Sequence, residues 1–214
     1  MRRTQLFLLL VLATFVAAGC GEFGQRYEGD DSKDSGNDTT EKLITDEEFT
    51  AAVAKRDGCD EEAEEFESEG NDHVDISESV TYKQNPPMSG NHWNDPSVPA
   101  PADYGFYDAT QRDEATVHNL EHGHIVITHK GLSDDAVDTL KGQWNKNDYH
   151  LLVEPRKKNP KDGVFYSAWT AQLFCKKPSA AALQYMIDNF RDQGPELFTD
   201  DPGGGEMGSG KKDN

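Results

Sequence analysis

The sequence predicts an α+β fold, a single domain in which a mainly antiparallel sheet carries its helices on one face. The chain has 214 residues, which suits one domain of ordinary size plus tails, because single domains hold about 100 to 200 residues. Two strand-like segments are followed by a strand, a helix, a strand, a hairpin and a helix. No internal repeat interrupts this order, so we expect one core.

Residues 1–19 have the form of a lipoprotein signal peptide. Arg2 and Arg3 precede an apolar run at residues 6–18, which is too short for a transmembrane helix of about 20 residues. The run ends in small residues directly before Cys20, which resembles a lipobox. We expect a mature chain that is anchored to the membrane through a lipidated Cys20, in the extracytoplasmic cell envelope. An ordinary cleaved signal peptide is the alternative.

Two segments are too polar to order themselves by burial. Residues 20–42 are rich in Gly, Ser, Asp and Asn, and residues 196–214 are Gly-rich and charged. Such compositions bury too little apolar surface to offset the entropy of ordering. We expect 20–42 to be a disordered stalk and 196–214 a disordered tail.

Residues 43–72 are expected to hold a helix and an acidic loop. Thr45 and Glu48 have the spacing of a capping box, which predicts a helix from there to about Arg56. The following run, 57–72, holds nine carboxylates in sixteen residues and is typical of a solvated loop. A calcium-binding loop is the alternative, but the required D-x-[DN]-x-[DN]-G spacing is absent.

Residues 73–195 carry the remaining elements of the predicted domain. The alternation at 73–76 and 79–82 predicts two short strands, and the proline-rich stretch 86–101 predicts a long loop. Helical spacing of apolar residues predicts helices that begin at Ser133 and at Pro178-Ser179. Asp162-Gly163 is placed where a hairpin turn is expected. The other strands are predicted at 125–129, 149–153, 164–169 and 172–175.

The charge excludes several classes of partner. Lys and Arg number 21 against 40 Asp and Glu, a formal net charge of −19. A nucleic-acid-binding protein needs a basic face for the phosphates, so we expect no nucleic acid partner. No Gly-rich phosphate loop occurs, so no organic cofactor is indicated. A protein partner is not identified by the sequence.

The cysteines indicate a disulfide. If Cys20 carries lipid, Cys59 and Cys175 remain in a compartment that oxidises thiols. A disulfide between them is the default in such a compartment. Metal ligation by the thiolates and two unpaired buried thiols are the alternatives.

The stretch VHNLEHGHIVITH, residues 117–129, holds four of the seven histidines. His118, Glu121 and His122 fit H-x-x-E-H, the inverted zincin pattern. Gly123 and the β-branched run that follows it indicate a strand, so we expect at most a single helical turn upstream. His118 and His122 would be about 6 Å apart across such a turn but about 13 Å apart in a strand. In an extended strand, His122 and His124 would share a face instead.

The motifs PPMSGNHW (86–93), YGFYD (104–108) and VHNLEHG (117–123) together resemble the DUF3105 family, which has no established activity. The likeness covers roughly residues 73–190. The resemblance implies a secreted or lipid-anchored domain, and it singles out four histidines as the characteristic set: His73, His92, His118 and His122. His124 departs from the family pattern. His129 and His150, which lie near strand ends, are expected to be ordinary surface or edge residues.

Three functions are open at this point. The first is a lipoprotein that binds copper or zinc through His92, His118, His122 and His73, with Glu121 and Asn119 as supporting residues. The second is a metal-dependent hydrolase that uses Glu121 as the base. The third is a structural or partner-binding lipoprotein with a metal-free histidine network and a recognition surface made by Trp93, Phe106 and Tyr107. Binding is favoured over catalysis.

Overall fold

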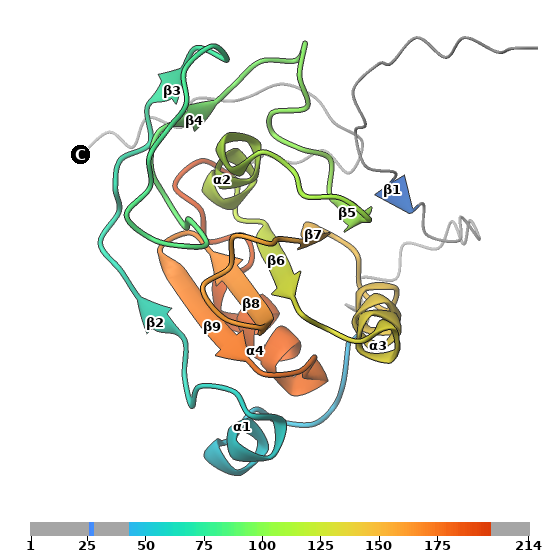
Figure 1. The fold of residues 1–214 in the computed structure, drawn as a ribbon. Helices are drawn as coiled ribbons and strands as arrows, with labels where there is room; N and C mark the ends of the chain where they lie inside the picture. The colour runs from blue at the N-terminus through green and yellow to red at the C-terminus, as the bar shows by residue number, and fades with distance from the viewer. Residues whose placement is uncertain (1–25, 28–42, 198–214) are drawn as a thin grey trace, which may run out of the picture.

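A mixed, mainly antiparallel sheet of seven strands forms the centre of the molecule (Figure 1). The computed structural model describes residues 26–27 and 43–197. Two neighbouring strand pairs, β5–β7 and β7–β6, are parallel, and the other four are antiparallel. In sheet order the strands are β1 (Arg26–Tyr27), β5 (Gly105–Tyr107), β7 (Leu151–Pro155), β6 (Ile125–Lys130), β8 (Gly163–Ala168), β9 (Ala171–Cys175) and β2 (Glu64–Glu65).

A second, parallel pair of short strands lies outside this sheet, formed by β3 (His73–Val74) and β4 (His92–Trp93). The helices are α1 (Ala51–Asp57), α2 (Asp113–Glu121), α3 (Asp134–Trp144) and α4 (Ala180–Phe190). These elements confirm the predicted α+β single domain with a mainly antiparallel sheet.

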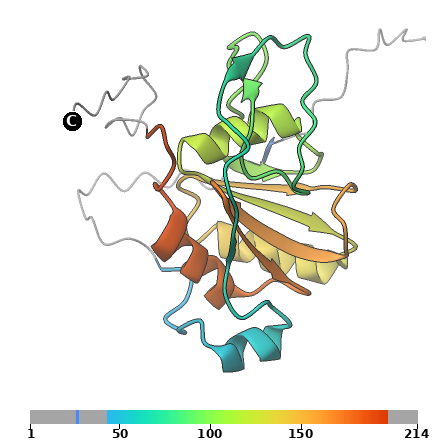
Figure 2. The ribbon, with the colours of Figure 1, turned by 90° about the vertical axis from the view of Figure 1, so that its left-hand side faces the viewer.

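Helices cover both faces of the sheet, which corrects the expectation of one face. Figure 2 shows α2 on one side of the strands and α3 and α4 on the other. The central strand β6 explains why both faces are covered. Ile125 and Ile127 belong to the core on the α3 and α4 side, whereas Val126 belongs to the core on the α2 side. A strand that is apolar on both faces must be covered on both.

The α3 and α4 side holds the larger apolar core. Both helices begin as predicted, because the hydroxyl of Ser133 accepts from the Ala136 amide and that of Ser179 accepts from the Ala182 amide. Their apolar stripes bury Leu140, Trp144, Leu183 and Met186 against Ile125, Ile127, Leu151, Val153, Tyr166 and Leu173 of the strands.

The N-terminal helix begins later than predicted. Thr50, and not Thr45, is the N-cap of α1, and its hydroxyl accepts from the Val53 amide. Thr45 instead accepts from the Glu47 amide in a local turn, and Glu47 pairs with Arg56. Both threonines offer the same capping chemistry, and the helix begins at the second of them.

The acidic run after α1 is tied to the sheet at two points. A disulfide joins Cys59 to Cys175 of β9, which confirms the predicted bond. Glu64 and Glu65 form β2 and pair with the same strand. The run is therefore an edge of the sheet as well as a loop.

Two other local predictions are wrong. β7 does not form a hairpin with β8, because β6 lies between them; the hairpin is β8–β9, and its turn contains Thr170 at φ 57°. Residues 79–82 are not a strand, whereas His92 and Trp93 in the proline-rich stretch are. Short-range turn signals do not reveal which strand lies between two others.

The signal peptide, Cys20, most of the predicted stalk and residues 198–214 lie outside the described residues. β1 falls within the predicted stalk and pairs with β5. Within residues 26–27 and 43–197, no helix has the length and apolar character needed to cross a membrane.

Candidate metal centre

Helix α2 carries the first two residues of the site, His118 and Glu121. It has nine residues, so the expectation of a single turn is wrong. Asp113 and Glu114 lie in its first turn, where carboxylates interact favourably with the helix dipole. The helix ends at Glu121 with His122 as its C-cap, and Gly123, with φ 81°, is the junction to β6 as predicted. A Cβ at Gly123 would lie 2.6 Å from the Asp192 Cα, so the close approach of the chain requires glycine there.

Three imidazoles converge on Glu121. His73 of β3 and His92 of β4 are paired in register, and their ring centroids lie 4.9 Å apart. The His118 ring lies 4.8 Å from that of His92 and 5.1 Å from that of His73. One ligand atom from each of the four side chains lies within 4.8 Å of all the others. This group can hold a metal ion.

Backbone carbonyls fix the orientation of two of these rings. His92 Nδ1 lies 2.8 Å from the Gly90 oxygen, and His118 Nδ1 lies 2.7 Å from the Trp93 oxygen. A carbonyl only accepts, so in each ring Nδ1 carries the hydrogen and the lone pair of the neutral ring is on Nε2. This is the arrangement that supporting residues impose on metal-bound histidines.

The surroundings of His118 and Glu121, two of the buried members, lower the pKa of both side chains. Burial lowers the pKa of His118 to about 3, with further lowering by charge on His122 and His92, so this ring is neutral at neutral pH. Burial raises the pKa of Glu121, but the hydrogen bond with His92 and the charges of the neighbouring histidines outweigh it and leave that pKa lowered. Among the described residues, His118 Nε2 is a buried nitrogen without a hydrogen-bond partner.

The close contact between the Glu121 carboxylate and the His92 ring requires a positive charge, either on the ring or on an ion between the two groups. Its Oε2 is 2.8 Å from His92 Nε2 and 3.5 Å from His73 Nε2, and its side chain is fully buried. Because His92 Nδ1 already donates to a carbonyl, Nε2 can donate to Glu121 only if the ring is an imidazolium. A buried carboxylate and a buried lone pair otherwise repel, and such groups are paired or bind metal.

His122 lies beside this group and not within it. Its ring centroid is 4.7 Å from that of His118, so one helical turn does bring the two together. Its ligand atom, however, groups with Glu121 and Glu196. His122 Nδ1 lies 2.7 Å from the Glu196 oxygen, and burial lowers the pKa of His122. The predicted four-histidine set is therefore divided, and Glu121 stands where His122 was expected.

Residues that the sequence did not reveal complete the site. The carbonyls of Gly90 and Trp93 act through backbone atoms, which no side-chain pattern encodes. Glu196 falls in the predicted disordered tail, and only the preceding Gly194-Pro195 marks a turn there. No local signal could have placed it beside α2.

Asn119 holds a loop instead of orienting a ligand. Its side chain accepts from the Ala102 amide and donates to the Ala102 oxygen, and it also donates to His124 Nδ1. Asn119 therefore fixes the end of the proline-rich stretch on α2. His124 and His129 are buried, so the expectation of a surface residue at His129 is wrong. His150 is half-buried directly before β7, where its side chain contacts Asp192.

The aromatic recognition surface is also wrong. Trp93, Phe106 and Tyr107 are 6%, 3% and 7% exposed, and they pack in the two cores. The metal-free partner-binding hypothesis loses its proposed surface with them.

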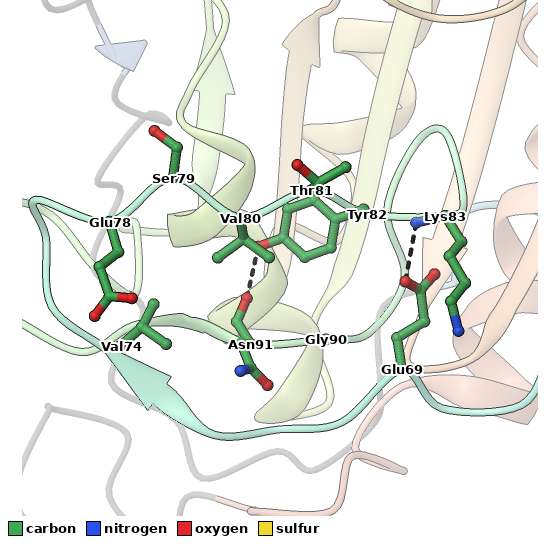
Figure 3. A pocket seen from close by; sticks show the side chains of 10 residues that line it. All are labelled: Glu69, Val74, Glu78, Ser79, Val80, Thr81, Tyr82, Lys83, Gly90 and Asn91. Atoms are coloured by element: carbon green, nitrogen blue, oxygen red, sulfur yellow. Dashed lines mark hydrogen bonds between the residues drawn. The ribbon is translucent and has the colours of Figure 1, made fainter.

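A cavity of about 380 Å³ lies beside β3 and β4, and Figure 3 shows the side chains that line it. The Tyr82 hydroxyl donates to the Asn91 oxygen, and Glu69 accepts from the Lys83 amide. The second bond ties the segment before His73 to the segment before His92, and the first lies within the segment before His92. The His73 side chain is 37% exposed, whereas those of His92 and Glu121 are fully buried, so solvent reaches the group from the His73 side.

A comparison with protein-family models matches residues 73–202 to the family described as "Protein of unknown function (DUF3105)". The match begins at the first histidine of the site and covers more than half of the chain. Neither a curated protein nor a solved structure matches the chain.

Proposed function

The chain belongs to the DUF3105 family, and we propose that it binds a transition-metal ion through His73, His92, His118 and Glu121. One observation carries the proposal. Two buried rings are held by carbonyls so that their Nε2 atoms face a buried carboxylate and one another, with no donor among the described residues to satisfy His118 Nε2. A cation at the centre would satisfy all of these lone pairs at once.

A metal-free hydrogen-bond network fits these contacts less well. Buried polar groups in such a network are almost always paired, because an unpaired one costs about 1–3 kcal/mol. Here His118 Nε2 and Glu121 Oε1 are both buried without partners among the described residues. Two such atoms in one cluster favour a site for an ion over a structural network.

The donor set favours Zn²⁺ or Cu²⁺. Imidazole nitrogens suit both ions, and copper binds more tightly than zinc at a site of equal geometry. Three nitrogens and one carboxylate oxygen also match the four-coordinate shell of zinc. The four side chains lie close enough together for a single ion.

The same contacts favour binding over hydrolysis. A hydrolytic zinc site keeps a coordination position for water and holds its general base outside the ligand shell. Glu121 instead lies 2.8 Å from the Nε2 of His92 and 3.5 Å from that of His73, where it would act as a ligand. We therefore place the protein among metal-binding proteins.

We place the site outside the cytoplasmic membrane, held there by lipid on Cys20. Support comes from the charged and apolar leader at residues 1–19 and the small residues before Cys20. The Cys59–Cys175 disulfide also supports an oxidising compartment. Cells that express the chain should incorporate labelled palmitate, and Cys20→Ala should abolish the label. Equal labelling of the two would contradict the anchor.

Metal content tests the binding proposal directly. The full chain, purified without a histidine tag, should contain about one Zn²⁺ or Cu²⁺ ion by elemental analysis. His118→Ala and His92→Ala should remove it, whereas His150→Ala, outside the group, should not. Circular dichroism verifies that each variant is folded. A folded wild-type chain that binds neither ion when dialysed against it would overturn the proposal.

A further inference from the structure

Glu121 belongs to two groups of ligand atoms. The first is the site described above, and the second joins Glu121 to His122 and Glu196, again with all ligand atoms within 4.8 Å of one another. We propose that this second group binds another divalent cation, one that prefers oxygen ligands, and that Glu121 bridges the two ions. The bridge rests on the proposed function, because it requires an ion in the first site.

The two oxygens of Glu121 have different surroundings. Oε2 faces His92 and His73. Oε1 is buried and accepts no hydrogen bond from the described residues. A carboxylate with one oxygen committed and the other buried and unpaired is suited to bridge two ions, which lie about 3.5–4 Å apart in two-metal sites.

A backbone carbonyl fixes the His122 ring, as carbonyls fix the rings of His92 and His118 in the first group. The Nδ1 of His122 lies 2.7 Å from the backbone carbonyl oxygen of Glu196, which only accepts. Nδ1 therefore carries the hydrogen, and the neutral ring has its lone pair on Nε2. Glu196 thus positions this imidazole through its backbone and adds a carboxylate through its side chain.

The segment that carries Glu196 is fixed on the end of α2. The backbone amide of Glu196 donates to the backbone carbonyl oxygen of Glu121, and that of Asp192 donates to the backbone carbonyl oxygen of Gly123. Between these two residues, a Cβ at Gly194 would lie 2.0 Å from the backbone carbonyl oxygen of Glu121, so only glycine allows the chain to pass this close to the end of α2. The second group is therefore built by the fold and does not depend on a chance meeting of side chains.

The ligands indicate the class of the second ion. Carboxylates suit Mn²⁺, Mg²⁺ and Ca²⁺, whereas imidazoles favour Zn²⁺ and Cu²⁺. The second group has two carboxylates and one imidazole, against one carboxylate and three imidazoles in the first. An ion that accepts both ligand types, such as Mn²⁺, fits it best. Glu196 is exposed, so we expect this ion to exchange with solvent more readily than the first.

The test uses Mn²⁺ on the full chain after loading with one equivalent of Zn²⁺. The loss of the free Mn²⁺ signal in electron paramagnetic resonance should show one Mn²⁺ bound per chain. Glu196→Gln should weaken this binding roughly tenfold or more and leave the zinc content unchanged. Glu61→Gln, an acidic position remote from both groups in sequence, should bind Mn²⁺ as the wild type does. His73→Ala should weaken the zinc site.

The outcomes separate the two proposals. Zinc without Mn²⁺, or Mn²⁺ that binds Glu196→Gln as tightly as wild type, overturns the second site and leaves the first. If neither Zn²⁺ nor Cu²⁺ binds the chain, the proposed function and the bridge both fail. In that case Mn²⁺ binding to the metal-free chain, lost in Glu196→Gln, would still support a cation at the second group, and equal binding would overturn it.

Discussion

The two faces of the sheet differ in what they bury. The face under α3 and α4 packs Ile125, Ile127, Leu151 and Val153 against apolar helix residues. The face under α2 buries many polar groups as well, namely His118, Glu121, Thr128, Glu154, Arg156 and Asn159. Neighbouring residues of one strand serve opposite roles, so the apolar face supplies stability while the other positions chemistry.

A network of charged and polar groups holds α2 in place on the polar face. Arg156 forms two hydrogen bonds with Asp113 in the first turn of α2, and it also donates to Asn85 and Asn159. At the other end, Gly194 and Glu196 contact Glu121. Buried ion pairs add little net stability, but breaking one is costly. The network therefore fixes the position of His118 more than it stabilises the fold.

The largest expected effect lies on the apolar face. Leu183→Ala removes a fully buried side chain of α4 and should lower the free energy of unfolding by about 2–5 kcal/mol. Metal bound per folded chain should not change, because α4 provides no ligand. Urea unfolding and elemental analysis measure the two quantities. Loss of metal from the folded variant would show that the faces are not independent.

Glu154→Gln should stabilise the protein in a pH-dependent way. Burial raises the pKa of Glu154 to about 8, against a hydrogen bond from the Gln111 amide that lowers it. Between about pH 4.5 and 8 the unfolded chain loses this proton while the folded chain keeps it. As the pH rises through this range, the free energy of unfolding of the wild type therefore falls by about 1.4 kcal/mol per pH unit.

Glu154→Gln keeps an acceptor for the Gln111 amide and carries no charge. Its free energy of unfolding should therefore equal that of the wild type at pH 4 and exceed it by a few kcal/mol near pH 7.5. Urea unfolding with EDTA present, at pH 4, 6 and 7.5, measures the difference. An advantage that does not change with pH would show that Glu154 is ionised in the folded protein.

The apolar face was largely predictable from the sequence, because helical spacing and serine caps are local signals. The caps at Ser133 and Ser179 and the buried strand at 125–129 were all found in this way. The distribution of helices over both faces was not, since it depends on where the chain crosses the sheet. β6 lies between β7 and β8 although it precedes both in sequence.

The candidate site was predictable only in part. His73, His92 and His118 were named from motifs, and the structure brings them together. The β-branched residues after Gly123 indicate a strand and give no sign that the residues before it form a helix of nine residues. Glu196 and the carbonyls of Gly90 and Trp93 reach the site through tertiary contacts, which a single sequence does not display.

The polar face should also lose stability in acid when no metal is bound. Burial lowers the pKa of His118 to about 3, so below about pH 6.5 the unfolded chain binds a proton that the folded chain does not. Between pH 6.5 and pH 5, the free energy of unfolding of the wild type should therefore fall by about 2 kcal/mol more than that of His118→Gln. Urea unfolding in EDTA measures this difference, and parallel curves for the two proteins would contradict a neutral, buried His118.

The smallest expected difference comes from a matched pair of cations over aromatic rings, one on each face. Arg112 lies 4.8 Å from the Trp93 ring centroid on the α2 side, and Lys141 lies 5.9 Å from that of Phe106 on the α3 side. Exposed contacts of this kind contribute about 0.5–1 kcal/mol, with tryptophan the best ring and about 6 Å the outer limit. Arg112→Gln should therefore destabilise the protein by about 0.5–1 kcal/mol and Lys141→Gln by less.

The contact between Arg112 and Trp93 lies next to the site, because the backbone carbonyl of Trp93 orients the His118 ring. If Arg112 only covers the ring, Arg112→Gln should lower stability and leave metal affinity unchanged. A loss of affinity in Arg112→Gln but not in Lys141→Gln would show that even an exposed contact on the polar face helps to set the ligand geometry.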